Sequence, residues 1–408
     1  MTFLKVLREK TAWGETTPSI LLVFNSFVWF TLTNAVLNTI VNELDLSETG
    51  TLILFTPYFV GIAASAIFGS KFFPRARAKF LYLWLFMGAI VTPFLIMVSS
   101  NGMLADALIA FFLGISIGIG LPSCLSYFAD STQIENRGFI GGITWSGVGF
   151  TVVFFAVLIS ELGVWEVIAA LAIWRLFGGF SFLFLTRQNK KPDVQKSSSY
   201  SELVRKREIL LYLFPWVMFS LINFAEMPIL ENSRVFGTEA FAFVGLAEYA
   251  FIGIFAIVGG IIADVVGRKR VVITGFVMLG IEYAVLSIFS GSPGTLYLFM
   301  TLDGITWGLF SSVFLTSIWG DLGENHEKEK YYVLGGLPFL LANFISILIR
   351  PYASDISPAA AFSFASFFLF LAVIPLMYAP ETLPEKAIKD RELNKYIEQA
   401  KKAKEKYT

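Results

Sequence analysis

The sequence contains one cysteine, one histidine and few charged residues, and each shortage excludes a class of site. With Cys124 alone, no intramolecular disulfide and no cysteine-based metal site can form. The single histidine, His326, lies in a charged loop, and we assign it no chemistry. Lys and Arg number 31 and Asp and Glu also 31, so the net charge is +0 and nothing favours a nucleic-acid partner. We expect no metal and no cofactor.

The composition indicates a protein whose main surroundings are membrane lipid. Charged residues make up 15% of the chain, against roughly 25% in soluble domains. Hydrophobic residues make up 56%, and the mean hydropathy is +0.69. The 43 Phe, 9 Trp and 33 Gly agree with this, because aromatic belts and close glycine contacts are enriched in membrane helices.

Twelve runs of the sequence are long and apolar enough to cross a bilayer, which takes about 20 residues as a helix. Their predicted limits are 18–42, 50–70, 79–99, 103–128, 138–160, 163–186, 209–230, 240–263, 270–290, 295–319, 331–350 and 358–379. The first run follows a basic stretch, as a signal peptide does, but it is too long and lacks a small-residue cleavage site. We therefore predict an all-α membrane protein of twelve transmembrane helices.

The basic residues predict the orientation, because loops rich in Lys and Arg stay in the cytoplasm. With the amino terminus inside, the cytoplasmic segments hold 28 of the 31 Lys and Arg residues. The exceptions are Arg175, Arg234 and Arg350. We expect a multi-pass protein of the cell membrane with both termini in the cytoplasm.

The chain divides into two similar halves around its longest polar interruption, a basic and Ser-rich segment. Setting Arg75 against Arg268 gives an offset of 193 residues (268 − 75), and Asp130 against Asp321 gives 191 (321 − 130). Two similar offsets predict that the chain consists of two repeats, each of six spans. The predicted domains are an N-terminal six-helix bundle (1–186), a cytoplasmic linker (187–208), a C-terminal six-helix bundle (209–380) and a cytoplasmic tail (381–408). Paired bundles of this kind bind a solute near the bilayer midplane and alternate its access by rocking.

The loop after the eighth span carries a spaced motif of small and charged residues. Its members are Gly260, Asp264, Gly267, Arg268 and Lys269. This pattern, G-x-x-x-D-x-x-G-R-K, resembles a loop of the major facilitator superfamily, at the place of its second copy. The resemblance covers about residues 15–382, and it implies two pseudo-symmetric six-helix bundles and a transporter. Pro380, Glu381 and Thr382 are similar to the ending of the sugar porters, but the linker lacks their signature, so the sugar-porter and general metabolite branches stay unresolved.

The resemblance implies that this loop closes the cytoplasmic side. Asp264 would meet the start of the fifth span, around Arg137 and Gly138, where unpaired N–H groups at a helix end favour a carboxylate. The alternative is that the basic residues of the loop only obey the positive-inside rule.

The first half departs from this pattern at one position. Lys71 stands where the repeat comparison places an acidic residue. We hypothesise a contact of reversed sign, in which Glu327 or Glu329 pairs with Lys71 or Arg75.

Three acidic residues inside the second-half spans are candidates for proton coupling, namely Glu226, Glu248 and Asp303. An ionised group in the bilayer costs about 2.5 to 3.5 kcal/mol on insertion scales, so each needs a partner or a wet cavity. If spans one, four, seven and ten line the cavity, as the resemblance implies, Glu226 and Asp303 face it. A structural hydrogen bond between helices is the alternative.

Glu282 and Arg175 lie on spans that should be peripheral, and we interpret them as packing or snorkelling residues.

Neutral polar residues supply candidates for solute binding, with hydrogen bonds between helices as the alternative. On the first span they recur at i, i+3 and i+7, and on spans seven and ten they lie within one turn of the acids. The candidates are Thr31, Asn34, Asn38, Asn223, Thr306 and Trp307. No lysine lies within a predicted span, so a neutral or cationic solute fits better than a multiply charged anion.

Small residues on the fifth span predict a close helix contact. Gly138, Gly142, Ser146 and Gly149 recur at spacings of three and four residues. Such a stripe allows two backbones to approach, and rocking between halves can use it.

The favoured function is secondary active transport of a small organic solute, a sugar or another metabolite, coupled to protons. A passive facilitator is an alternative, as is a multidrug efflux antiporter, although the fourth span lacks a membrane arginine and the fifth lacks a proline. A membrane sensor without transport is an alternative of another class. We expect no enzyme, because no histidine lies in a predicted span and no phosphate-binding loop occurs.

Overall fold

A computed structural model describes residues 11–72, 77–98, 102–159, 162–184, 198–231, 237–289, 292–323 and 327–384. Within these ranges the secondary structure is helical, and twelve segments are long and apolar enough to cross a membrane, as predicted. Arg75, Arg234, His326, most of the predicted linker and the tail after residue 384 lie outside the described residues.

The first six spans form one group of helices. They are α2 (Trp13–Glu43), α3 (Glu48–Phe72), α4 (Arg77–Val91) with η2 (Thr92–Met97), α5 (Met103–Gly118) with α6 (Leu121–Ser131), α7 (Arg137–Ile159), and α8 (Val164–Phe177) with η3 (Gly178–Phe184). We call this group the first half.

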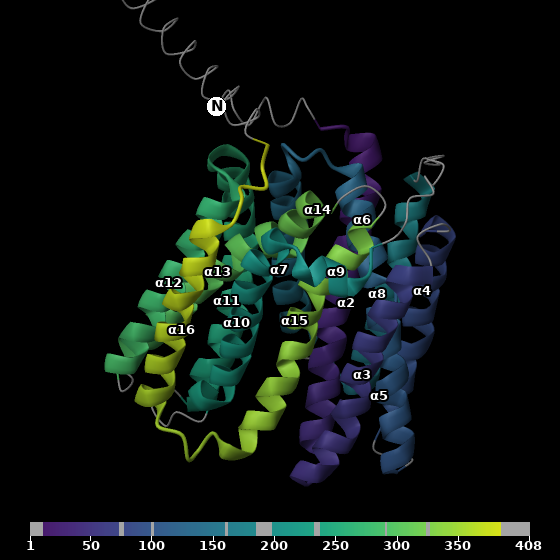
Figure 1. The fold of residues 1–408 in the computed structure, drawn as a ribbon. Coiled ribbons are helices and arrows are strands. Elements are labelled where there is room, and N and C mark those ends of the chain that lie inside the picture. Colours follow the sequence, from purple (N-terminus) through teal and green to yellow (C-terminus); the bar gives the residue numbers. More distant parts are fainter. Residues whose placement is uncertain are drawn as a thin grey trace, which may run out of the picture.

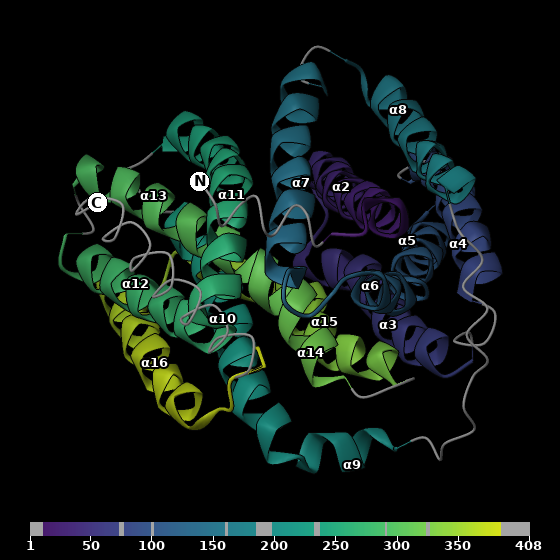
Figure 2. The same ribbon diagram turned by 90° about the horizontal axis from the view of Figure 1, so that it is seen from above.

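The last six spans form the second half. They are α10 (Arg207–Glu231), α11 (Gly237–Val266), α12 (Arg268–Ile288), α13 (Pro293–Phe310) with η4 (Ser311–Ile318) and α14 (Trp319–Leu322), α15 (Lys328–Ile349) with η5 (Arg350–Tyr352), and α16 (Pro358–Tyr378). Seen from above, the two groups lie side by side, with α7 next to α11 and α3 next to α15 between them (Figure 2).

The two ends of the bundle differ in charge. At one end, the basic end, α4, α7, α12 and α15 begin with Arg77, Arg137, Arg268 and Lys328. The chain enters α2 and leaves α16 at this same end, at the top of Figure 1. At the other end, the far end, α2 finishes at Glu43.

Glycines bring the two halves into backbone contact along α7 and α11. A Cβ atom added to Gly142 would lie 2.4 Å from the carbonyl oxygen of Ala256, and one added to Gly260 would lie 2.1 Å from that of Gly138. Side chains at these positions would force the helices apart, so the small-residue stripe forms the interface between the halves.

Two spans deviate from a regular helix. The fourth breaks between α5 and α6, where Trp84 packs on Gly120 so closely that an added Cβ would lie 2.1 Å from its ring, and where Pro122 lacks an N–H. The tenth widens into a π-helix, η4, whose residues are all buried. There the hydroxyls of Thr316 and Ser317 both donate to the carbonyl of Ser312, at 2.7 Å. Such segments are often found at functional sites.

Part of the predicted linker is a short helix, α9 (Tyr200–Arg205). It begins with a capping box, in which Ser199 accepts from the backbone of Glu202 and Glu202 accepts from that of Ser199. The Tyr200 hydroxyl lies 2.5 Å from that of Ser70 on α3. Burial raises the pKa of the Tyr200 hydroxyl and so favours its protonated form. The S-x-x-E spacing was a readable signal that our interpretation of the segment as a plain linker overlooked.

Candidate functional site

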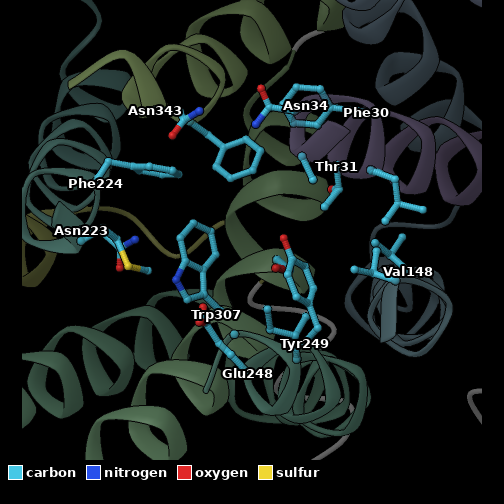
Figure 3. Close-up of a pocket in the computed structure, with 18 of the residues that line it drawn as sticks. Phe30, Thr31, Asn34, Val148, Asn223, Phe224, Glu248, Tyr249, Trp307 and Asn343 are labelled. Carbon is cyan, nitrogen blue, oxygen red and sulfur yellow. The ribbon is translucent and has the colours of Figure 1, made fainter. Parts of the chain in front are cut away.

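A cavity of about 540 Å³ lies between the two halves. Its walls come from α2, α3 and α7 in the first half and from α10, α11, α13, η4 and α15 in the second (Figure 3). A second hollow of about 640 Å³ lies between the cavity and the far end, and Asn38, Met227 and Asn343 line both. The cavity is therefore reached from the far end.

The cavity carries neutral polar groups from both halves. Thr31, Asn34 and Asn38 line it from α2, and Asn223 lines it from α10. Asn34 accepts a hydrogen bond of 3.3 Å from the Tyr58 hydroxyl. Figure 3 shows the amides from different helices around one space. Six of the residues that we predicted from the sequence thus line one cavity, namely Thr31, Asn34, Asn38, Asn223, Trp307 and Glu248.

Several polar atoms of the lining have no protein partner among the described residues. They are the indole nitrogens of Trp145 and Trp307 and the amide oxygen of Asn223. Trp307 is 7% exposed and Asn223 is 3% exposed. Buried donors and acceptors rarely stay unpaired. A solute or ordered water in the cavity would satisfy them.

The aromatic lining exceeds what the sequence led us to expect. Phe339 on α15 is central to it, with ring centroids 6.3 Å from Phe30, 6.4 Å from Phe224 and 5.7 Å from Trp307. Phe30 belongs to the first half and the others to the second, so this cluster bridges the halves. The lining residues that we did not predict include Tyr58, Trp145, Tyr249, Phe339 and Asn343. Of these, Asn343 could have been predicted from the sequence, because it is a polar amide inside the apolar eleventh span.

Glu248 lies at the wall of the cavity, and Asp303 lies behind it. Glu248 is among the lining residues, whereas Asp303 is 0% exposed and is not. The two carboxyl groups lie within hydrogen-bonding reach of each other. No protein N–H or O–H in the described part of the chain donates to either Asp303 oxygen. One proton held between the two carboxyls would supply the missing hydrogen bond.

The other two acids of the second half differ from our expectation. Glu226 does not line the cavity, although the next residue, Met227, does, and Glu226 is 9% exposed. Glu282 is fully buried, neither carboxyl oxygen finds a donor among the described residues, and it lies near Glu248. Of the two interpretations that we gave for Glu282, its burial excludes snorkelling and leaves packing. Asp303 and Thr306 likewise stay outside the lining, and no residue of the fourth span reaches it.

Arg175 is also buried rather than snorkelling. Its guanidinium carbon lies 4.5 Å from the Trp29 ring centroid and 4.2 Å from that of Trp84. Its Nη1 donates to the Asn25 side chain at 3.2 Å and to the Ser26 hydroxyl at 2.8 Å. The two indole faces take the place of a carboxylate partner.

Asp264 closes the basic end by binding the start of α7. Its carboxylate accepts hydrogen bonds from the backbone N–H groups of Gly138, at 3.1 Å, and Phe139, at 2.7 Å. These are unpaired donors at a helix amino terminus, where the helix dipole favours an anion. Arg268 Nη2 lies 3.0 Å from Asp264 and neutralises it.

Asp321 at the end of α14 joins both halves to this closure. It pairs with Arg137 of the first half, and its other oxygen lies 3.0 Å from Arg268 Nε of the second. Thr382 donates to Asp321 at 3.1 Å. Glu381 accepts from the backbone N–H groups of Arg268, at 2.9 Å, and Lys269, at 3.2 Å. The short ending after the last span therefore caps α12 and supports the closure.

A second set of ion pairs crosses the basic end on the opposite side. Arg77 at the start of α4 pairs with Glu329 of α15 and, at 2.6 Å, with Asp130. Lys328 also reaches Asp130, at 2.6 Å. Of the contacts of reversed sign that we hypothesised, the structure does not place Lys71 on Glu329, because Lys71 instead lies over the Tyr200 ring at 5.7 Å. The alternative base, Arg75, lies outside the described residues.

Comparison with known proteins identifies the fold. No protein-family model and no curated protein matches the sequence. The solved human organic anion transporter MFSD10 (TETRAN) superposes with a TM-score of 0.69 at 14% identity, over 89% of this chain and 99% of that one. The proton:xylose symporter XylE, solved with 6-bromo-6-deoxy-D-glucose, gives a TM-score of 0.63 at 15% identity, over 91% and 96%. The chain thus has the major facilitator fold, as the motif around Asp264 predicted.

Proposed function

We propose that the protein is a secondary active transporter that carries a small neutral or cationic organic solute through the cavity between its halves. The observation that carries this proposal is the asymmetry of access. Buried ion pairs around Asp264 and Asp321 and a partly buried one at Arg77 close the basic end, while the cavity continues into the hollow at the far end. A binding site that is open on one side only is one of the two states that alternating access requires.

The solved structures of the same fold support this class of function. One is named as an organic anion transporter and the other as a proton:xylose symporter. Both names describe carriers of small organic molecules. A sugar or another small metabolite that hydrogen-bonds to amides would suit the neutral polar groups of this cavity.

Proton coupling is proposed for the carboxyl pair of Glu248 and Asp303. The pair lies against the cavity and no Lys or Arg in the described part of the chain forms an ion pair with it. A second proton taken up on one side of the membrane would make the pair neutral, and its release on the other side would return the pair to the form that shares one proton. A passive facilitator would use the same cavity without this step.

The basic end is proposed to face the cytoplasm of a cell membrane, with both termini on that side. The cationic starts of α4, α7, α12 and α15 all lie at this end, as the positive-inside rule requires. The structure would then represent the outward-open state.

Transport across proteoliposomes tests this proposal. Purified protein would be reconstituted and assayed with labelled xylose, amino acids and benzyltrimethylammonium, with and without an imposed pH gradient. We expect accumulation of one of these solutes to follow the gradient, and Asp303→Asn to abolish accumulation while solute exchange persists. Asp355→Asn, in an exposed loop at the far end, is the matched control.

The possible results separate the functions. Equilibration that ignores the pH gradient would indicate a facilitator. An Asp303→Asn protein that accumulates solute normally would remove the proton role from this pair. Absence of flux for every solute class, with the protein folded, would favour a sensor.

A further inference from the structure

The cavity has an unbalanced charge. Among the described residues that line it, Glu248 is the only one with a formal charge, and none of them is Lys, Arg or His. A cavity with one carboxyl and no base repels an anion and attracts a cation, and low-dielectric walls strengthen both effects.

In the described part of the chain, the carboxyl groups that interact with Glu248 from behind the cavity wall are those of Asp303 and Glu282. If one proton is shared between Glu248 and Asp303, one negative charge remains on that pair. The buried cation Arg175 does not compensate it, because it lies in the first half between Trp29 and Trp84 and does not line the cavity.

Aromatic faces surround the same space. The cluster of Phe339 with Phe30, Phe224 and Trp307 meets in the cavity, and Tyr249 lies beside Glu248 (Figure 3). Ring faces attract organic cations, most strongly when water is excluded, and they cover apolar groups equally well. Carboxylate and rings together favour a cation with an apolar body over a small hydrated ion.

We propose that the cavity selects organic monocations with an apolar or aromatic body, such as substituted ammonium ions, and rejects organic anions. The cationic group would lie at Glu248, and the apolar body would lie against the cluster around Phe339. This inference rests on the proposed transport function and narrows its solute class from neutral or cationic solutes to cations. A volume of about 540 Å³ holds a ligand of the usual small-molecule size. One lining carboxyl matches one positive charge.

The charge preference can be measured before the natural solute is known. Because Cys124 is the only cysteine, Cys124→Ala gives a background for one reporter thiol, and Asn343→Cys places that thiol in the cavity. The rate at which this thiol is modified would be measured with a cationic reagent, trimethylammonium-ethyl methanethiosulfonate, and with an anionic one, sulfonatoethyl methanethiosulfonate. Each rate would be divided by the rate of the same reagent with free mercaptoethanol, which corrects for the different reactivities of the two reagents. We expect the cationic reagent to be favoured on the order of tenfold or more.

Two variants locate the source of the preference. Glu248→Gln in the reporter protein should lower the ratio of the normalised cationic rate to the normalised anionic rate to within about threefold of one. A reporter made by Asn42→Cys, which is exposed in the hollow at the far end, should keep its own rate ratio when Glu248 is replaced by Gln. A normalised ratio near one in the reporter protein with Glu248 intact overturns the proposal, and so does a ratio that Glu248→Gln leaves unchanged.

Protection of the reporter thiol tests the ligand class directly. Benzyltrimethylammonium should slow modification of the cysteine at position 343, while N,N-dimethylbenzamide and 3-phenylpropionate, its neutral and anionic counterparts, should protect at least tenfold less at equal concentration. Equal or stronger protection by the anion overturns the proposal. Because these assays need no flux, a protein that prefers cations and carries nothing contradicts only the transport function. One that transports without a charge preference contradicts only the inference about its solute.

Discussion

The carboxylate of Asp264, near the end of α11, accepts a hydrogen bond of 2.7 Å from the backbone N–H of Phe139, in the first turn of α7. This contact joins the two halves at the basic end and uses a donor that the helix leaves unpaired. Asp264 is 0% exposed, so its contribution depends on the halves staying together.

We predict that Asp264→Ala opens the basic end. The substitution leaves the N–H groups of Gly138 and Phe139 and the guanidinium of Arg268 without this acceptor, at a cost of about 3 to 5 kcal/mol to the closed state. The distance between spin labels on the exposed positions Lys79 and Thr274, one in each half, should increase when measured by pulsed electron paramagnetic resonance. Asp355→Ala at the far end is the control, and an unchanged distance distribution for Asp264→Ala would contradict the prediction.

We predict that Arg77, and not Lys71, stabilises the contact of α4 with α15. Arg77→Ala leaves Glu329, whose side chain is 1% exposed, without its partner, and should lower the free energy of unfolding by about 3 kcal/mol. Lys71→Ala removes one exposed contact with the Tyr200 ring and should cost less than about 1 kcal/mol. Thermal unfolding of the two variants in the same detergent compares them, and a larger loss for Lys71→Ala would refute the assignment.

We predict that Gly142→Ala separates the halves more than Gly147→Ala does. The new methyl group at position 142 meets the backbone carbonyl of Ala256 at 2.4 Å, and a backbone cannot move aside alone. The one at position 147 meets the Phe24 ring at 3.2 Å, which can rotate. The efficiency of cross-linking between α7 and α11, or the distance between the same pair of spin labels, should change more for Gly142→Ala than for Gly147→Ala. Equal behaviour of both would mean that the helices do not approach this closely.

We predict that Arg175 tolerates Met better than Lys. The planar guanidinium stacks between Trp29 and Trp84, and an ammonium there would be buried without either a flat face or a carboxylate partner. Met fills a similar volume and carries no charge to desolvate. Arg175→Lys should lower the unfolding temperature more than Arg175→Met, with Arg205→Met in the exposed end of α9 as the control. The reverse order would show that the charge itself is needed.

The sequence alone determined the number of spans, because helix length and hydropathy are local properties of the chain. It also identified the motif around Asp264 and the polar stripe of Thr31, Asn34 and Asn38, because spacing within one helix fixes which residues share a face. The fold followed from these together with the resemblance that the motif carried.

Only the tertiary structure decided which faces meet. Lys71 and Arg77 lie close in sequence and carry the same charge, yet one lies over a tyrosine ring and the other pairs with Glu329. Asp303 and Glu248 are equally acidic in the sequence, but only Glu248 reaches the cavity. Burial and pairing depend on which helix lies next to a residue. Packing among residues far apart in the sequence decides this, and the pattern of residues within a single helix does not show it.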